Sequence, residues 1–267
     1  SAGMARRQLR PIITVTLYQK LQETSSMRKS LLTVSLFALA ACGAAETTAP
    51  AAEAEAQTVE TAEATAAPAE EVAPEIGPAG TYTLDPTHAS LVWTVNHFGL
   101  SNYTARFTKF DATLEFNPDD ASATSLTVTI DPTSVETDYP GDFKATHADS
   151  PYDTFDEEIA QDAGYFNAGE YPEITFTSTE ITQTGPSTGT VTGDLTFLGV
   201  TKPVTLDVTY NGTATFPWAP EQPKIGFSAT GSFNRSAFGL EKLVPNVGDE
   251  VNLTIETEFA MAVPAAE

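Results

Sequence analysis

An alternation of apolar and polar residues constrains this chain more than any other feature. From Val251 to Phe259, apolar residues occupy every second position with one exception, and polar residues stand between them. Side chains of a β-strand point alternately to its two faces, so this pattern predicts a strand with one apolar and one solvated face. Thr, Val, Phe and Tyr, which favour strands, are frequent throughout residues 81–267.

The same alternation recurs often enough to predict eight or nine strands. We expect them at residues 81–84, 89–97, 106–116, 126–130, 174–181, 190–197, 204–208, 225–233 and 251–259. Turn-forming sequences stand at Asn117–Asp120, Gly185–Ser187, Asn211–Gly212 and Asn246–Asp249. A sheet of this size stacks on another or closes on itself. The prediction is an all-β fold, a lipocalin-like antiparallel eight-stranded barrel with room inside for one small ligand.

The segment 137–166 departs from the strand pattern. Ser150 suits a helix N-cap, Pro151 suits the first helical position, and the acidic residues that follow favour a helix start. We therefore expect one or two short helices that cover one end of the barrel.

Residues 1–42 contain an N-terminal extension and an export signal. Met27 to Lys29 form a basic start, and residues 30–41 form an uncharged, largely apolar stretch. This order is typical of a secretory signal, and the stretch is too short to span a bilayer comfortably. The ending Leu39-Ala40-Ala41-Cys42 resembles the bacterial lipoprotein signal, which implies acylation of Cys42 and a membrane anchor. The alternative is a plain signal peptide with an incidental cysteine.

This signal predicts a location in the periplasm of the bacterial cell envelope, with the chain held to a membrane by Cys42. Gly43 rather than Asp follows the cysteine, which by resemblance to lipoprotein sorting favours the outer membrane. Residues 43–80 contain eight Glu, no Lys or Arg and no aromatic residue, so we expect a disordered acidic tether. Its reach as a flexible linker is roughly 35 Å. Residues 81–267 then form the barrel domain.

Charge excludes some classes of partner. The chain has 36 acidic and 13 basic residues and a formal net charge of -23. A nucleic-acid binder needs Lys and Arg to neutralise phosphates, so we expect no nucleic-acid partner. Adhesion to an anionic membrane through surface charge is disfavoured for the same reason.

Sequence blocks across 81–267 resemble the YceI-like family, and they occur in that family's order. They include Asp85-Pro86-Thr87-His88, Thr192-Gly193-Asp194-Leu195-Thr196-Phe197, Gly199-Val200-Thr201-Lys202-Pro203-Val204 and Asn234-Arg235-Ser236-Ala237-Phe238-Gly239. Two features depart from the family pattern. Trp93 stands where the family usually has Phe, and the stretch from Lys144 to Gly164 is longer and more acidic.

The resemblance implies an exported lipocalin-like barrel whose apolar lumen takes a long polyisoprenoid, of the quinone or polyprenyl-phosphate type. It carries over no catalytic residue, so we expect a carrier or reservoir and not an enzyme. One alternative is a structural or stress-related surface lipoprotein whose barrel is filled with side chains. Another is an enzyme that acts on an isoprenoid lipid through His97 and Arg235.

The apolar parity of the strands gives a set of candidate ligand-binding residues. The set is Leu91, Trp93, Val95, His97, Phe227, Phe233, Arg235, Leu253 and Ile255. Arg235 shares the apolar parity, and a charge that faces the interior needs a partner. Either Arg235, with His97, holds a polar lipid headgroup, or Arg235 pairs with a carboxylate such as Asp85 or Asp249.

We expect no metal and no cofactor other than the lipid ligand. His147 lies in sequence among Asp142, Asp149 and Asp153, but their spacing matches no metal-binding loop. Beyond the isoprenoid lipid and the membrane, a homodimer of the chain is the one further partner that we consider.

Overall fold

The computed structural model describes residues 73–263. The predicted signal, Cys42 and the tether as far as residue 72 lie outside the described residues. Ten strands make one antiparallel sheet: β1 (Gly80–His97), β2 (Ser101–Phe107), β3 (Phe110–Phe116), β4 (Ser125–Ile130), β5 (Val135–Glu136), β6 (Ile174–Gln183), β7 (Thr188–Phe197), β8 (Val200–Phe216), β9 (Ala219–Asn234) and β10 (Val247–Met261).

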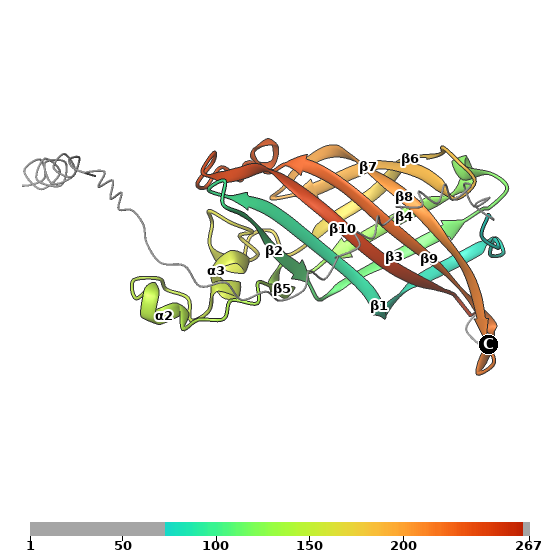
Figure 1. Cartoon of the computed structure of the whole chain (residues 1–267), viewed down its shortest axis with the longest axis horizontal. Helices are drawn as coiled ribbons and strands as arrows, with labels where there is room; N and C mark the ends of the chain where they lie inside the picture. The colour runs from blue at the N-terminus through green and yellow to red at the C-terminus, as the bar shows by residue number, and fades with distance from the viewer. Residues whose placement is uncertain (1–72, 264–267) are drawn as a thin grey trace, which may run out of the picture. The chain divides into compact units, whose positions relative to one another are not determined.

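The sheet closes into a barrel because β10 pairs with β1 as well as with β9 (Figure 1). The closed ring is β1, β10, β9, β8, β7, β6, β4 and β3 in order of neighbours, which confirms the predicted eight-stranded barrel. β1 pairs with β3 through residues 80–83 and with β2 through residues 91–97. β2 and β3 therefore take one place in the wall in succession.

Several predicted boundaries are wrong: β10 already begins at Val247, inside the turn expected at Asn246–Asp249, and β8 is longer than the strand expected at 204–208. Three further errors have a local cause. The strands expected at 81–84 and 89–97 are one strand, β1, with an irregularity between Leu84 and Ala89. The strand expected at 106–116 is bent into β2 and β3, because Thr108 and Lys109 donate their main-chain N–H groups to Ser134 from outside the strands. Asn211–Gly212 is a bulge inside β8 rather than a turn, with Gly212 at φ 126°.

Two short helices, α2 (Phe143–Thr146) and α3 (Phe155–Gln161), lie at one end of the barrel (Figure 1). The helix predicted to start at Ser150 begins at Phe155 instead. Thr154 is its N-cap, and Thr154 and Glu157 form a reciprocal capping box that satisfies two main-chain donors. Ser150 instead donates its hydroxyl to the carboxylate of Glu158. Within residues 73–263, no helix combines the length and the apolar character needed to cross a bilayer.

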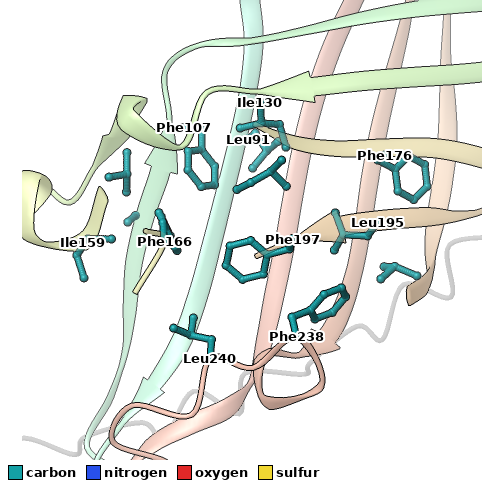
Figure 2. Packing of buried hydrophobic residues seen from close by; sticks show 14 of the residues in the cluster. Leu91, Phe107, Ile130, Ile159, Phe166, Phe176, Leu195, Phe197, Phe238 and Leu240 are labelled. Carbon is teal, nitrogen blue, oxygen red and sulfur yellow. The ribbon is translucent and has the colours of Figure 1, made fainter. Parts of the chain in front are cut away.

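The segment 137–173 and the β9–β10 connection pack over this end, which we call the covered end. Phe166 from the segment meets Phe107 and Phe197 from the barrel wall, with ring centroids 5.5 and 5.7 Å apart (Figure 2). Phe238 and Leu240 reach the same cluster from the β9–β10 connection. The cover is therefore held by aromatic packing rather than by strand pairing.

Residues 73–79 do not behave as the end of a free tether. Gly77 is buried and donates its N–H to the Tyr210 hydroxyl at 2.9 Å, and the fully buried Tyr82 donates to the carbonyl of Pro78 at 2.8 Å. These residues contact the barrel at the end opposite the cover. Composition alone predicted disorder here because the contact with Tyr210 joins residues 133 positions apart in the chain.

Candidate functional site

The barrel encloses a cavity of about 660 Å³ whose lining is mostly aliphatic and aromatic. This volume lies within the range of about 300–1,000 Å³ typical of small-molecule sites. The cavity is elongated, because its lining on β1 runs from Leu84 to His97. That stretch corresponds to roughly 30 Å along the barrel axis, given about 3.3 Å per residue and the usual strand tilt.

The structure places all nine candidate residues on the wall of this cavity: Leu91, Trp93, Val95 and His97 from β1, Phe227 and Phe233 from β9, Arg235 just after β9, and Leu253 and Ile255 from β10. Inward parity was therefore predicted correctly on three strands. The space is left open by the side chains around it, which include small ones such as Ala112 and Ala229.

Arg235 is buried, with 5% of its surface exposed, and its guanidinium is used by the main chain. It donates hydrogen bonds of 2.7–3.1 Å to the carbonyl oxygens of Gly248, Leu240, Lys242 and Val247. Burial lowers the pKa of Arg235, and the nearby charge of Asp249 opposes that shift. The geometry assigns to Arg235 the task of holding the β9–β10 connection against the barrel.

The expectation that Arg235 pairs with Asp85 or Asp249 is wrong. Asp85 bonds Lys224, whose Nζ lies 2.5 Å from its Oδ2. Asp249 instead accepts hydrogen bonds from the N–H and the hydroxyl of Ser236. Main-chain carbonyl oxygens, and not a carboxylate, accept the hydrogen bonds of Arg235. The positions of carbonyl groups cannot be predicted from a sequence pattern.

The mouth of the cavity at the covered end carries a cation that sequence reasoning missed, Lys242. Its Nζ lies 3.0 Å from Oδ1 of Asp162 and 3.8 Å from the centre of the Tyr165 ring. Burial disfavours ionisation of Asp162, but the N–H of Gly164 and the ammonium of Lys242 outweigh it, so the pKa of Asp162 is lowered. Lys242 and Tyr165 both line the cavity.

His97 lies at the same mouth and is exposed. Its ring meets that of Phe98 edge to face, with centroids 4.8 Å apart. Of the two residues expected to hold a headgroup, His97 thus lies at the mouth of the cavity. The guanidinium of Arg235 is instead hydrogen-bonded to main-chain carbonyls of the β9–β10 connection and of β10. Lys242 and His97 are the polar groups that a headgroup would meet there.

Trp93 lines the cavity and packs edge to face on Phe166 of the covering segment, with centroids 6.1 Å apart. Its indole Nε1 is the one buried side-chain nitrogen or oxygen without a hydrogen-bond partner among residues 73–263. The departure from the usual Phe thus adds ring surface to the cavity wall and a donor that the protein does not satisfy.

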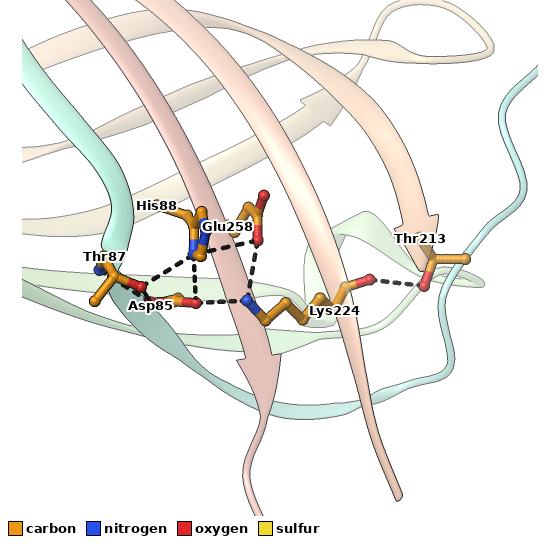
Figure 3. A network of polar contacts seen from close by, with 6 residues as sticks. All are labelled: Asp85, Thr87, His88, Thr213, Lys224 and Glu258. Carbon is orange, nitrogen blue, oxygen red and sulfur yellow. Dashed lines mark hydrogen bonds and ion pairs between the residues drawn. The ribbon is translucent and has the colours of Figure 1, made fainter. Parts of the chain in front are cut away.

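A polar network on the barrel wall brings together Asp85, His88 and Glu258, whose ligand-type atoms lie within 4.8 Å of one another (Figure 3). A lysine ammonium already serves these groups, because Nζ of Lys224 lies 2.5 Å from Asp85 and 3.1 Å from Glu258. The hydrogen bond from Lys224 is the main reason why the pKa of Asp85 is strongly lowered. Through these contacts the network joins β1, β9 and β10 on the wall of the barrel.

The second histidine that the sequence singled out, His147, stacks on Phe143 with centroids 4.4 Å apart. Its Nδ1 lies 2.9 Å from the hydroxyl of Thr146. Among the described residues, His147 is not part of a cluster of potential metal ligands, and nearby Asp142 caps α2 instead.

Comparison with known proteins agrees with this architecture. The YceI-like domain family matches residues 82–259. A "Protein YceI" of Escherichia coli O157:H7 is 33% identical over 171 residues, which cover 64% of this chain and 81% of the relative. A UPF0312 protein of Pseudomonas putida strain GB-1 is 34% identical over 154 residues, which cover 58% of this chain and 72% of the relative.

Two solved structures share the fold. The Campylobacter jejuni YCEI protein is 30% identical, with a TM-score of 0.52, and the match covers 63% of this chain and 90% of that one. Burkholderia cenocepacia BcnA has a TM-score of 0.54 at 23% identity, over 66% of this chain and 98% of that one. At that identity, the second comparison bears on the fold alone.

Proposed function

Because this chain belongs to the YceI-like family and its barrel encloses an elongated apolar cavity, we propose that it binds a long isoprenoid lipid in the lumen, as a carrier or reservoir in the bacterial periplasm. The observation that carries the proposal is the lining, which on β1 as far as Val95 consists of Leu84, Leu91, Trp93 and Val95, with the indole nitrogen of Trp93 as their single side-chain polar atom. Polar groups gather at the covered end, where His97, Tyr165 and Lys242 line the cavity. An isoprenoid tail offers the same distribution, a long apolar chain with one polar terminus.

Burial of hydrocarbon supplies the affinity. At about 25 cal/mol per Å², a tail that buries about 400 Å² gains roughly 10 kcal/mol before the costs of binding. No directional contacts are needed along the tail, so a wall of Leu, Val, Ile and Phe is sufficient. No chemical step enters this proposal.

The headgroup belongs at the covered end, where Lys242, His97 and Tyr165 line the mouth. Lys242 is the cation closest to a phosphate-type group entering there, and it is available to such a group only by giving up part of its contact with Asp162. A quinone needs no cation and leaves that ion pair intact. We propose a neutral quinone-type headgroup for this reason.

The proposed location depends on Cys42, which lies outside the described residues. Acylation there would tether the barrel to a membrane, with the outer membrane favoured by Gly43. A structural lipoprotein with a filled barrel is the competing function. The open volume of about 660 Å³ favours the carrier.

The first test is mass spectrometry of organic extracts from protein purified without detergent. An isoprenoid in about equal molar amount supports the carrier. A clean extract, followed by no uptake of added quinone, contradicts it.

Uptake can be followed through Trp93. Trp218, the second tryptophan of the chain, is 79% exposed and lies away from the cavity lining, so Trp218→Phe leaves Trp93 as the sole indole. Quinone in the lumen should quench it. Ala229→Phe, which points into the cavity, should abolish quenching, whereas Thr230→Phe, exposed on the next position of β9, should not.

A further inference from the structure

Three exposed apolar side chains gather at the covered end of the barrel. Phe98 and Leu100, in the β1–β2 turn, are 50% and 85% exposed, and Leu243, in the β9–β10 connection, is 50% exposed. The two loops lie side by side, because the N–H of Phe98 donates to the carbonyl of Asn246 at 2.7 Å. We call Phe98, Leu100 and Leu243 the apolar rim.

The backbone holds two rim residues in a conformation that bulky side chains disfavour. Phe98 has φ 54° and Leu243 has φ 64°. Such left-handed positions are ordinary for Gly, Asn or Asp, and cost of order 1–3 kcal/mol for other residues. The chain therefore bears a backbone cost at positions where it also exposes a Phe and a Leu to water. The conformation of Phe98 belongs to the β1–β2 turn, which Gly99 (φ 72°) shares and which the N–H of Leu100 closes on the carbonyl of His97 at 3.0 Å; the turn does not require that the residue at position 98 be a Phe.

The rim is continuous with the cavity. Leu243 lines the cavity itself, and so do His97, next to Phe98, and Val247, which pairs with His97 across β1 and β10. Exposed apolar surface at the rim thus adjoins the apolar lining at Leu243 and Val247, beside the polar groups of His97 and Lys242 at the same mouth. A hydrocarbon chain that passes along Leu243 and Val247 exposes less of its length to water, which is the costly part of moving a lipid.

We infer that the apolar rim inserts into the headgroup–acyl boundary of a lipid bilayer and that the ligand passes between bilayer and cavity at this point. The inference rests on the proposed function for its second half, the passage of ligand. The occupant is a lipid surface because the path ends in a cavity suited to a lipid. The net charge of -23 makes Coulomb attraction to anionic lipids an implausible driving force, so the contact is apolar.

The test uses residues 42–267 with Cys42→Ser, so that neither an acyl chain nor the apolar stretch 30–41 contributes, and vesicles of phosphatidylcholine, which carry no net charge. Phe98→Asn with Leu100→Ser removes two rim side chains that do not line the cavity and gives position 98 a residue suited to φ 54°. Partition onto vesicles and the rate of quinone transfer to them should both fall by about tenfold, given the apolar area lost.

Trp218→Ser is the matched control. Trp218 is also an exposed apolar side chain, 79% exposed, but it lies in the turn between β8 and β9 and not in the two loops that form the rim. It should leave both measurements unchanged, and 0.5 M NaCl should not weaken partition of the parent. Unchanged partition of the rim variant overturns the inference. So does a parent that dimerises through the rim, seen as a dimer that the rim variant converts to monomer in sedimentation.

Failure of the proposed function looks different. A parent that takes up no quinone but partitions onto vesicles through the rim contradicts the carrier proposal and keeps the bilayer contact. A parent that takes up quinone but whose rim variant partitions and transfers normally contradicts the bilayer contact alone.

Discussion

Nζ of Lys242 lies 3.0 Å from Oδ1 of Asp162, and this ion pair joins the β9–β10 connection to the segment that covers the barrel. Each side chain is 34% exposed, so solvent weakens the pair and we assign it little of the global stability. Its position at the cavity mouth matters more. It ties together the two segments that form the mouth of the cavity at the covered end.

Asp162→Asn should therefore speed ligand exchange more than it lowers stability. We expect release of bound quinone to quicken a few-fold, while the free energy of unfolding changes by less than about 1 kcal/mol. Stopped-flow quenching of Trp93 measures the first and urea unfolding the second. Glu115→Gln is the control, because Glu115 bonds Thr81 at the opposite end. Equal exchange rates in both variants would contradict a role for the ion pair.

Arg235→Lys should destabilise the protein by about 2–4 kcal/mol. A lysine ammonium cannot reach the four carbonyl oxygens that the guanidinium serves, and buried acceptors left without donors are costly. Chemical unfolding without ligand measures the loss.

The headgroup alternative for Arg235 makes the opposite prediction. If Arg235 mainly held a headgroup, Arg235→Lys would keep its stability and change the preference between charged and neutral lipids. Preserved stability with altered selectivity is thus the result that would contradict our assignment.

Trp93→Phe should change stability by less than about 1 kcal/mol, even though it removes part of a large side chain. The indole N–H has no partner among the described residues, so no hydrogen bond is lost, and the vacated volume joins a cavity that already exists. Leu91→Ala, at a position only 6% exposed, should cost about 2–4 kcal/mol. Thermal unfolding compares the two. A loss at Trp93 as large as that at Leu91 would show that the indole N–H has an acceptor.

The inward set of residues could be predicted from the sequence because strand parity is local. Leu91, Trp93 and Val95 alternate with residues that face solvent, and a strand converts that order directly into a lining. The same reasoning placed Arg235 on the cavity side. It could not show that Arg235 serves carbonyls, since those belong to a loop whose path depends on the whole barrel end.

Lys242 shows the other limit of sequence reasoning. It follows Glu241 in a loop without periodicity, and nothing nearby marks it as part of a site. Its partner, Asp162, is 80 residues away, in the segment that covers the barrel. Only the folding of the cover onto the barrel brings the two together.

Acid should destabilise the barrel partly through Asp85. The pKa of its carboxyl is lowered below the usual value of about 3.9, chiefly by the hydrogen bond from Lys224 and then by that from Thr87. A lowered pKa in the folded state means that the stabilisation is fully present above about pH 4 and is lost as the pH falls toward the folded value. His88 and Glu258 are the other titratable groups that contact Asp85 and Lys224.

We expect Asp85→Asn to lower the free energy of unfolding by about 1–2 kcal/mol at pH 7, and its difference in stability from the parent to shrink steadily below pH 4. Urea unfolding at pH 7, 5, 4 and 3 measures it, and a difference that stays constant down to pH 3 would show that the carboxylate charge is not what stabilises this part of the wall.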